Sequence, residues 1–226
     1  MNIVIILAGG TGTRLGADLP KQYIEVAGKP IIAYCLKFFE KSDYADAVWV
    51  VAERSWHDYI LQWTGNKFRG FSEPGANRQL SIWNALQGIH DFAEGKDIAI
   101  IHDAVRPLVT ERLMRDCVHA CMGHDGALPV LPMKDTVYLG DGKKITSLLE
   151  RKNVYAGQAP EAFVFEKYYQ ANKSLLPDKM MEINGSTEPA VIAGMDIALV
   201  DGDETNFKIT TREDLDRFIR MENAKR

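Results

Sequence analysis

Short apolar runs alternate with amphipathic stretches along the chain, and this alternation limits the possible fold more than any other feature of the sequence. The runs, which we predict to form strands, are residues 2–7, 47–52, 98–102, 126–131 and 196–200. The amphipathic stretches, which we predict to form helices, are residues 31–40, 55–63, 79–93, 111–122, 166–174 and 211–221. Such alternation favours a mostly parallel sheet with helices on both faces. We therefore predict an α/β fold in which ligands bind beyond the carboxyl ends of the strands.

The length and composition fit one domain. A chain of 226 residues, 46% of them hydrophobic, can bury a substantial core, so we predict a single domain over residues 1–226. The formal net charge of -4 provides no global basic field, which argues against nucleic acid or a membrane surface as a partner. No apolar run approaches the roughly twenty residues of a membrane span. The odd number of cysteines, three, is typical of a reducing compartment, and we expect a cytoplasmic protein.

The first predicted strand ends in a small, glycine-rich turn, residues 8–13 (AGGTGT), and Arg14 and Lys21 follow. A turn almost without side chains lets backbone N–H groups approach a bound anion. The turn is not a P-loop, because Gly12 is followed by threonine and arginine instead of lysine. It is not a dinucleotide fingerprint either, because Leu15 occupies the place of the third glycine. A flexible loop without a ligand remains an alternative, but the two cations favour a polyphosphate site.

Two further clusters lie where a strand ends or a helix begins. Residues 75–81 (GANRQLS) form a glycine turn before a predicted helix, suited to holding a base or ribose or simply to starting the helix. In residues 100–107 (IIHDAVRP), Asp103 ends a buried strand and Arg106 follows three positions later. An acid at such a position can hold a divalent cation on a triphosphate or position a hydroxyl. A purely structural ion pair with Arg106 is the alternative.

Two weaker clusters complete the set. Residues 134–136 (KDT), together with Arg151, offer a cradle for the phosphate of a second substrate, although such residues are more often a solvated rim. Residues 206–211 (NFKITT) place Lys208 just before a helix start, where a lysine either meets a phosphate or faces solvent.

One segment interrupts the alternation of strands and helices. Residues 136–146 read as two short strands about an Asp141-Gly142 turn, a strong hairpin pattern. Because an isolated two-stranded ribbon is only marginally stable in water, we expect residues 134–158 to be an arm that packs against another subunit in a homodimer.

Taken in order, the motifs LAGGTGTR, LPKQY, GANRQLS, HDAVRP, KDT, YAGQAPEAF and NFKIT resemble those of the CTP-dependent cytidylyltransferases that act on small polyol phosphates. This family includes the enzymes for 2-C-methyl-D-erythritol 4-phosphate and for ribitol 5-phosphate. The resemblance covers nearly the whole chain. It implies a Rossmann-like nucleotidyltransferase fold with a protruding hairpin, the substrates CTP and a polyol phosphate, a magnesium ion, and a homodimer formed through the arm.

The resemblance also implies a role for each matching residue. The catalytic cations are Arg14, Lys21 and Lys208. The residues expected to bind CTP are Leu7, Ala8, Gly9, Gly10, Gly12, Thr13, Gly75, Arg78, Ser81 and Ala104. The residues expected to bind the polyol phosphate are Asp103, Arg106, Thr136, Arg151 and Thr187, and Asp103 is also the expected metal ligand.

The chain departs from the family pattern on the acceptor side. Residues 159–161 are Ala-Pro-Glu where the family often has Thr-Pro-Gln, and residues 186–188 are Ser-Thr-Glu where the methylerythritol enzymes often have Thr-Asp-Glu. We expect ribitol 5-phosphate as the acceptor, because HDAVRP and residues 155–158 look more like the ribitol-phosphate enzymes, and 2-C-methyl-D-erythritol 4-phosphate is the alternative. Two other classes stay open: an NAD-linked oxidoreductase, for which Glu53 is a weak ribose-binding candidate, and a catalytically silent binding subunit.

Overall fold

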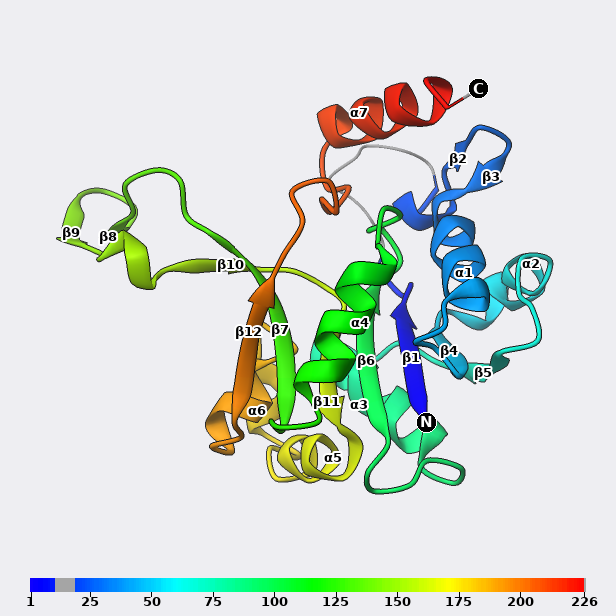
Figure 1. The fold of residues 1–226 in the computed structure, drawn as a ribbon, viewed down its shortest axis with the longest axis horizontal. Coiled ribbons are helices and arrows are strands. Elements are labelled where there is room, and N and C mark those ends of the chain that lie inside the picture. The colour runs from blue at the N-terminus through cyan, green and yellow to red at the C-terminus, as the bar shows by residue number, and fades with distance from the viewer. Residues whose placement is uncertain (11–18, 226) are drawn as a thin grey trace.

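The computed structural model describes residues 1–10 and 19–225, and among these residues eight strands form one central sheet (Figure 1). The strands of the sheet are β1 (Asn2–Leu7), β4 (Ala47–Val51), β5 (Phe68–Ser72), β6 (Ile98–Asp103), β7 (Gly126–Pro132), β10 (Tyr155–Gly157), β11 (Glu161–Val164) and β12 (Ile197–Asp201). The helices are α1 (Ile31–Lys41), α2 (His57–Leu61), α3 (Arg78–Ile89), α4 (Glu111–Ala120), α5 (Phe165–Lys173), α6 (Glu188–Ile192) and α7 (Arg212–Asn223). Two small ribbons are added, β2 (Glu25–Val26) with β3 (Lys29–Pro30) and β8 (Tyr138–Gly140) with β9 (Ile145–Leu148).

The sheet is mostly parallel, as predicted. Its order is β10-β7-β11-β6-β1-β4-β5, and β12 pairs in parallel with β7. The pairs of β1 with β4 and β6, and of β4 with β5, are parallel too, whereas β11 and β10 run antiparallel to their neighbours. The sheet is therefore mixed, with its antiparallel part on the side from which the arm leaves.

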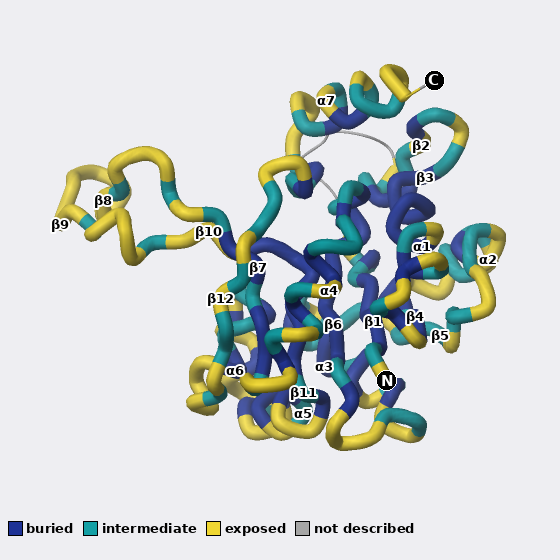
Figure 2. The backbone as a smooth tube through the Cα atoms, viewed as in Figure 1, coloured by how far each residue is buried: buried dark blue, intermediate teal, exposed yellow. Residues whose placement is uncertain are grey.

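Helices cover both faces of the sheet because the strand residues alternate between two cores. Val4 and Ile6 pack with α1 and α4 on one face, whereas Ile3 and Ile5 pack with α3 and α5 on the other. All four of these β1 side chains are fully buried, as expected of a central parallel strand. A third cluster joins α1 and α7 at one end of the sheet through Tyr34 and Phe218. Figure 2 shows the buried central strands and the exposed arm.

Three neighbouring strands end side by side, and this fixes the place of the site. Leu7, the last residue of β1, is paired in register with Val51 of β4 and with Asp103 of β6. The turns that follow these strands therefore start from one edge of the sheet, where open α/β sheets bind ligands.

The arm confirms the predicted hairpin. β8 and β9 pair antiparallel, Gly142 has a φ of 85°, and the Asp141 side chain accepts hydrogen bonds from the backbone of Lys143 and Lys144. Figure 1 shows the arm extending away from the sheet.

Some expected elements differ from the observed ones. The predicted helix over residues 55–63 is a 3-10 turn, Arg54–Trp56, followed by the short α2, and the helix expected to reach residue 93 ends at Ile89. Three strands of the sheet were not predicted: β5 is interrupted by Gly70, β10 is only three residues long, and β11 is four residues long and begins with a glutamate. No helix within residues 1–10 and 19–225 is long and apolar enough to span a membrane.

Candidate active site

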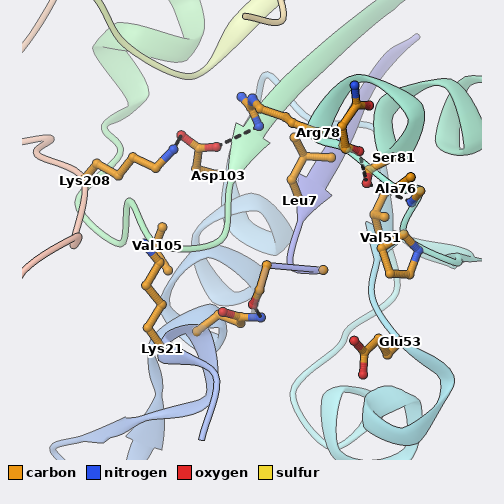
Figure 3. Close-up of a pocket in the computed structure, with 16 residues that line it drawn as sticks. Leu7, Lys21, Val51, Glu53, Ala76, Arg78, Ser81, Asp103, Val105 and Lys208 are labelled. Atoms are coloured by element: carbon orange, nitrogen blue, oxygen red, sulfur yellow. Dashed lines mark hydrogen bonds and ion pairs between the residues drawn. The ribbon is translucent and has the colours of Figure 1, made fainter. Parts of the chain in front are cut away.

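A cavity of about 590 Å³ opens at the carboxyl ends of β1, β4 and β6. Its lining comes from the turn after β1, the segment around Lys21, the turn before α3, and the ends of β4 and β6 (Figure 3). The lining residues that the sequence had singled out are Leu7, Gly9, Gly10, Lys21, Glu53, Gly75, Arg78, Ser81, Asp103 and Lys208. Motifs that lie far apart in the sequence therefore meet in this one cavity.

Close backbone contacts shape the walls of this cavity. A Cβ on Gly9 would lie 2.4 Å from the Cβ of Pro74, so the turn after β1 can touch the turn before α3 only because residue 9 lacks a side chain. Gln22 fixes the same turn, since its side-chain amide donates to the carbonyls of Ala8 (2.5 Å) and Gly10 (2.8 Å) on either side of Gly9.

The start of α3 forms a second rigid wall. The Asn77 side chain caps the helix by accepting from the backbone N–H of Leu80 (2.8 Å). The hydroxyl of Ser81 donates to the carbonyl of Asn77 and accepts from the N–H of Gly75, both at 2.9 Å. A Cβ on Gly75 would lie 2.4 Å from the Cβ of Leu80, so this turn also requires glycine. Ser81 therefore shapes the turn, and its own hydrogen is already used.

Asp103 is the electrostatic centre of the site. It is 6% exposed, and three cations surround it: Arg78 at 3.0 Å, Lys208 at 3.1 Å and Arg106 at 3.3 Å. Burial alone would raise the pKa of Asp103, but Arg78, Lys208 and Arg106 outweigh burial and hold this pKa well below its usual range. Figure 3 shows Lys208 and Arg78 on opposite sides of the carboxylate. Asp103 thus stays ionised and positions three cations, of which Arg78 and Lys208 line the cavity.

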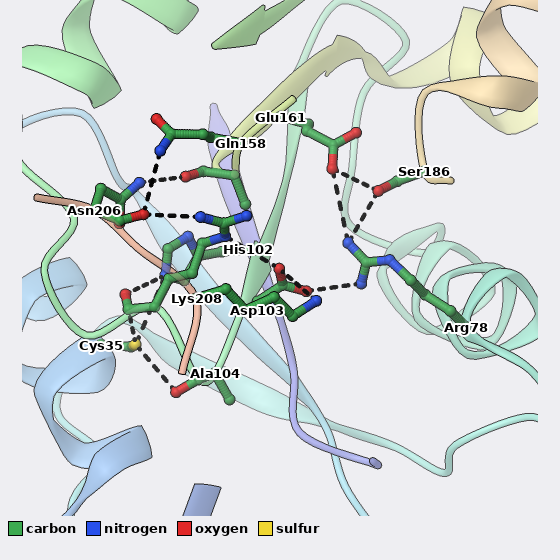
Figure 4. Close-up of polar contacts among 12 residues, drawn as sticks. Cys35, Arg78, His102, Asp103, Ala104, Gln158, Glu161, Ser186, Asn206 and Lys208 are labelled. Atoms are coloured by element: carbon green, nitrogen blue, oxygen red, sulfur yellow. Dashed lines mark hydrogen bonds and ion pairs between the residues drawn. The ribbon is translucent and has the colours of Figure 1, made fainter. Parts of the chain in front are cut away.

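Beside the main cavity lies a second one of about 270 Å³, and the two share Arg78, Asp103 and Lys208. The second cavity is also lined by Glu161 of β11 and by Thr187, which directly precedes α6. Glu161 is 8% exposed. Its carboxylate accepts hydrogen bonds from Ser186 and Thr187, both at 2.6 Å, and lies 3.7 Å from Arg78. Figure 4 shows its contacts with Ser186 and Arg78. Burial raises the pKa of Glu161, while Arg78 and the two hydroxyls act in the opposite direction.

Buried amides hold the segment that carries Lys208. Gln158 and Asp203 form a reciprocal pair of hydrogen bonds, side-chain amide to backbone carbonyl and backbone N–H to side-chain oxygen, each 2.9 Å long. Asn206, which is fully buried, donates to the carbonyl of Ala159 (2.7 Å), and its own carbonyl accepts from Arg106 (2.8 Å). These contacts fix Lys208 and Arg106 relative to the sheet.

A histidine next to the site is unsuited to proton transfer. His102 is fully buried, and burial lowers its pKa to about 4, so it is neutral near pH 7. Its Nε2 contacts the carbonyl of Arg106 at 3.1 Å and the Sγ of Cys35 at 3.7 Å. It supports the turn after β6 and does not face either cavity.

The structure brings together many, but not all, of the predicted site residues. Leu7, Gly9, Gly10, Lys21, Gly75, Arg78, Ser81, Asp103, Arg106, Thr187 and Lys208 line one cavity or both. Ala8 and Ala104 are buried and line neither cavity, because their positions next to the strand ends point them into the core. Gly12, Thr13 and Arg14 lie outside the described residues.

Thr136 and Arg151 stand apart from both cavities. Both residues are exposed on the arm, and Arg151 donates to the backbone carbonyl of Lys134 (2.9 Å). Within one chain, these two residues therefore do not form a cradle with Asp103 and Arg106.

Sequence reasoning did not identify the supporting residues Gln22, Gln158 and Asn206. Each is a buried amide inside a motif that was noticed for another residue, namely LPKQY, YAGQ and NFKIT. A buried amide needs hydrogen-bond partners, and here the partners are the backbone of the loops that carry the cations.

The chain is similar to known proteins over nearly its whole length. The family described as 2-C-methyl-D-erythritol 4-phosphate cytidylyltransferase matches residues 2–219. The chain is 31% identical over 232 residues to the 2-C-methyl-D-erythritol 4-phosphate cytidylyltransferase of Geotalea uraniireducens, with 98% of each chain covered. It is 30% identical over 225 residues to the ribitol-5-phosphate cytidylyltransferase of Lacticaseibacillus paracasei, with 96% of each covered.

The fold is shared with solved structures as well. The crystal structure of the Francisella tularensis 2-C-methyl-D-erythritol 4-phosphate cytidylyltransferase superposes with a TM-score of 0.83 at 23% identity, covering 96% of this chain and 98% of that one. With the family match over nearly the whole chain, the protein belongs to the 2-C-methyl-D-erythritol 4-phosphate cytidylyltransferase family and is a nucleotidyltransferase, a cytidylyltransferase.

Proposed function

We propose that the chain transfers CMP from CTP to ribitol 5-phosphate, with release of pyrophosphate. The observation that carries this proposal is that two adjacent cavities share Arg78, Asp103 and Lys208. A nucleotide in one cavity and a phosphorylated acceptor in the other would therefore both lie next to the cations Arg78 and Lys208. The larger cavity, with its glycine turns, suits CTP, and the smaller one suits the acceptor. Family membership replaces the hypothesis of an NAD-linked oxidoreductase.

The reaction proposed is in-line attack by a phosphate oxygen of the acceptor on the α-phosphorus of CTP. A phosphate monoester is mostly dianionic near neutral pH, because its second pKa is about 6, so the nucleophile needs no general base. The neutral, buried His102 agrees with such a mechanism. The task of the chain is to bring two anions together and to stabilise the charge on the α-phosphate and on pyrophosphate. We assign this task to Arg14, Lys21 and Lys208, with Arg106 on the acceptor phosphate.

A magnesium ion is the cofactor we propose, with Asp103 as its ligand from the chain. No cluster of three or more acidic, histidine or cysteine side chains suited to a metal occurs in the described part of the chain. Asp103 nevertheless fits, because Mg²⁺ is commonly held by one or two carboxylates together with substrate phosphates. Both of its oxygens already contact cations, so coordination would displace one of these contacts. When bound, the ion would neutralise phosphate charge.

The choice of acceptor rests on residues 102–107 and 155–158, which look more like the ribitol-phosphate enzymes. The KDT motif at residues 134–136 looks more like the methylerythritol branch, which makes 2-C-methyl-D-erythritol 4-phosphate the second candidate. Pyrophosphate release from CTP and magnesium should be measured with each polyol phosphate in turn. We expect the higher kcat/KM with ribitol 5-phosphate. Exclusive turnover of the methylerythritol phosphate would reverse the assignment, and no release with either would identify a silent subunit.

Lys21 provides the direct test of the electrostatic mechanism. Loss of one transition-state donor commonly costs about 3 to 4 kcal/mol. The Lys21→Ala variant should therefore lower kcat by about two decades or more. Lys173→Ala, which alters an exposed lysine outside both cavities, is the matched control. A Lys21→Ala enzyme within a few-fold of wild type would contradict the mechanism.

We also propose that the arm, residues 134–158, joins two copies of the chain in a homodimer. Its apolar side chains face solvent in the single chain: Tyr138 (55% exposed), Leu139 (55%), Ile145 (65%), Leu148 (64%) and Tyr155 (45%). A second copy that covers them would remove this apolar surface from water. In such a dimer, Arg151 and Thr136 would reach the partner's acceptor cavity.

A further inference from the structure

One wall of the smaller cavity is held in place by a buried carboxylate. This wall consists of Glu161, Ser186 and Thr187, and Ser186 is 2% exposed. The backbone of Ser186 is fixed as well, because its carbonyl accepts from the hydroxyl of the fully buried Tyr168 (2.7 Å). The three side chains therefore form one rigid unit, in which the carboxylate is the common partner. Figure 4 shows the contact between Glu161 and Ser186.

The hydrogen bonds of this unit have a defined direction. A carboxylate only accepts, so the hydroxyls of Ser186 and Thr187 both donate their hydrogens to Glu161, at 2.6 Å each. Ser186 also accepts from Arg78 (3.0 Å). The hydrogen-bonding groups that remain for a ligand are therefore acceptors only, namely the hydroxyl oxygen of Thr187 and the unused lone pairs of the Glu161 carboxylate. Such a wall binds hydrogen-bond donors.

The other side of the cavity has the opposite character. Lys208 and Arg106 contact Asp103 there, and both line the cavity. A phosphorylated acceptor therefore has one favourable orientation, with its phosphate at Lys208 and Arg106 and its hydroxyl end at Glu161. Glu188 strengthens the separation, because it lines the same wall as Glu161 and its carboxylate is held by the backbone N–H of Asn184 (2.8 Å).

We propose that Glu161 is a specificity-determining residue. By taking the hydrogens of the Ser186 and Thr187 hydroxyls, it leaves the wall able only to accept hydrogen bonds, and it thereby selects polyol phosphates that carry a hydroxyl at the end farthest from the phosphate. The inference rests on the proposed cytidyl transfer and goes beyond it, because it assigns the recognition of the distal hydroxyl to a single carboxylate. Glutamine cannot replace that carboxylate, since its NH₂ group cannot accept from a hydroxyl. One of the two hydroxyls would turn and present a hydrogen to the cavity.

The test pairs a variant with a modified acceptor. Initial rates of pyrophosphate release are measured for wild type and Glu161→Gln with ribitol 5-phosphate and with 1-deoxyribitol 5-phosphate, which lacks the distal hydroxyl. Wild type should prefer the full acceptor by about 10- to 100-fold, the range for a hydrogen bond to a charged group. In Glu161→Gln most of this preference should disappear, through a higher KM for ribitol 5-phosphate, while the KM for CTP stays within about twofold of wild type.

Two further variants make the outcome decisive. Glu182→Gln alters an exposed glutamate outside both cavities and should keep the full preference. Thr187→Val removes the lone pairs that Thr187 contributes to the wall while keeping a side chain of similar size, and it should weaken the same preference even if Glu161→Gln fails to fold. An equal loss of kcat/KM for both polyol phosphates in Glu161→Gln and Thr187→Val would overturn the role of Glu161 and leave the proposed reaction intact. No turnover of either acceptor by wild type would overturn the proposed reaction together with it.

Discussion

At the scale of single residues, Asp103 organises the site more than any cation does. It is the last residue of β6, so the sheet itself fixes its backbone, and its carboxylate then gathers three cations from α3, from the turn after β6 and from the segment before α7. The sequence indicated an acid at a strand end with an arginine three positions later. It did not indicate Arg78 as a partner, because that contact depends on how α3 packs against the sheet.

Asp103 should also make stability depend on pH. Its pKa is held well below the ordinary value, so the carboxylate stabilises the fold above that value, about 3.9, and this contribution is lost as the pH falls toward the lower, folded-state pKa. At pH 7 Asp103→Asn should be less stable by about 1 to 3 kcal/mol, since it leaves the nearly buried Arg106 and the partly exposed Arg78 and Lys208 without a counter-charge.

Urea unfolding of wild type and Asp103→Asn between pH 7 and pH 2.5 would measure this. The difference in unfolding free energy should stay constant down to about pH 5 and shrink below about pH 4. Asp178→Asn, at an exposed position, should show no such difference. A gap between wild type and Asp103→Asn that does not depend on pH would show that the carboxylate acts by shape and not by charge.

At the scale of elements, the strands and helices were the most predictable part of the chain. The spans of β1, β6 and α1 agree with the prediction to within one residue, because each is a long apolar or amphipathic segment. β10 and β11 were missed, because they are short and their pairing with β7 depends on contacts distant in sequence. Glu161 lies on β11, and its partners come from the segment before α6, so its role could not be derived from spacing alone.

The turn before α3 allows a prediction about an element. A methyl group on Gly75 would lie 2.7 Å from the backbone carbon of Leu80 and 2.9 Å from the backbone nitrogen of Ser81, atoms that cannot move without shifting the helix start. Gly75→Ala should therefore destabilise the protein by about 1 to 3 kcal/mol and raise the KM for CTP. Differential scanning calorimetry and CTP saturation kinetics would check both effects.

The control for this experiment is a glycine in open space. Gly123, in the turn after α4, has nothing within 4 Å of an added Cβ, so Gly123→Ala should stay within about 0.5 kcal/mol of wild type. If Gly75→Ala behaved like Gly123→Ala in both measurements, the close contact at the start of α3 would not be what shapes the nucleotide cavity.

At the scale of the whole molecule, the position of the arm is hard to reconcile with a site complete in one chain. Thr136 and Arg151 are residues that the family resemblance assigns to the acceptor, yet both are exposed on the arm and line neither cavity. The homodimer proposed above would resolve this conflict if it is isologous, because a two-fold axis would give each arm the same place on the other subunit.

Complementation between two inactive variants would test whether Arg151 acts in the partner's site. Lys21→Ala should inactivate a site from within its own subunit, whereas Arg151→Ala should inactivate the site of the partner. In a mixed dimer, the subunit that keeps Lys21 would receive an intact Arg151, so one of its two sites is complete. Random pairing of the co-expressed variants should therefore restore about a quarter of wild-type kcat, although each variant alone is nearly inactive.

The control pairs two defects that should lie in one site. Lys21 and Lys208 line the cavity of their own subunit. In a mixed dimer of Lys21→Ala with Lys208→Ala, each site therefore keeps one defect of its own, and activity should stay at the level of the single variants. Sedimentation velocity establishes that each mixture is dimeric. A dimeric mixture of Lys21→Ala and Arg151→Ala without recovered activity would show that Arg151 does not serve the partner, and a monomeric wild type would refute the role of the arm altogether.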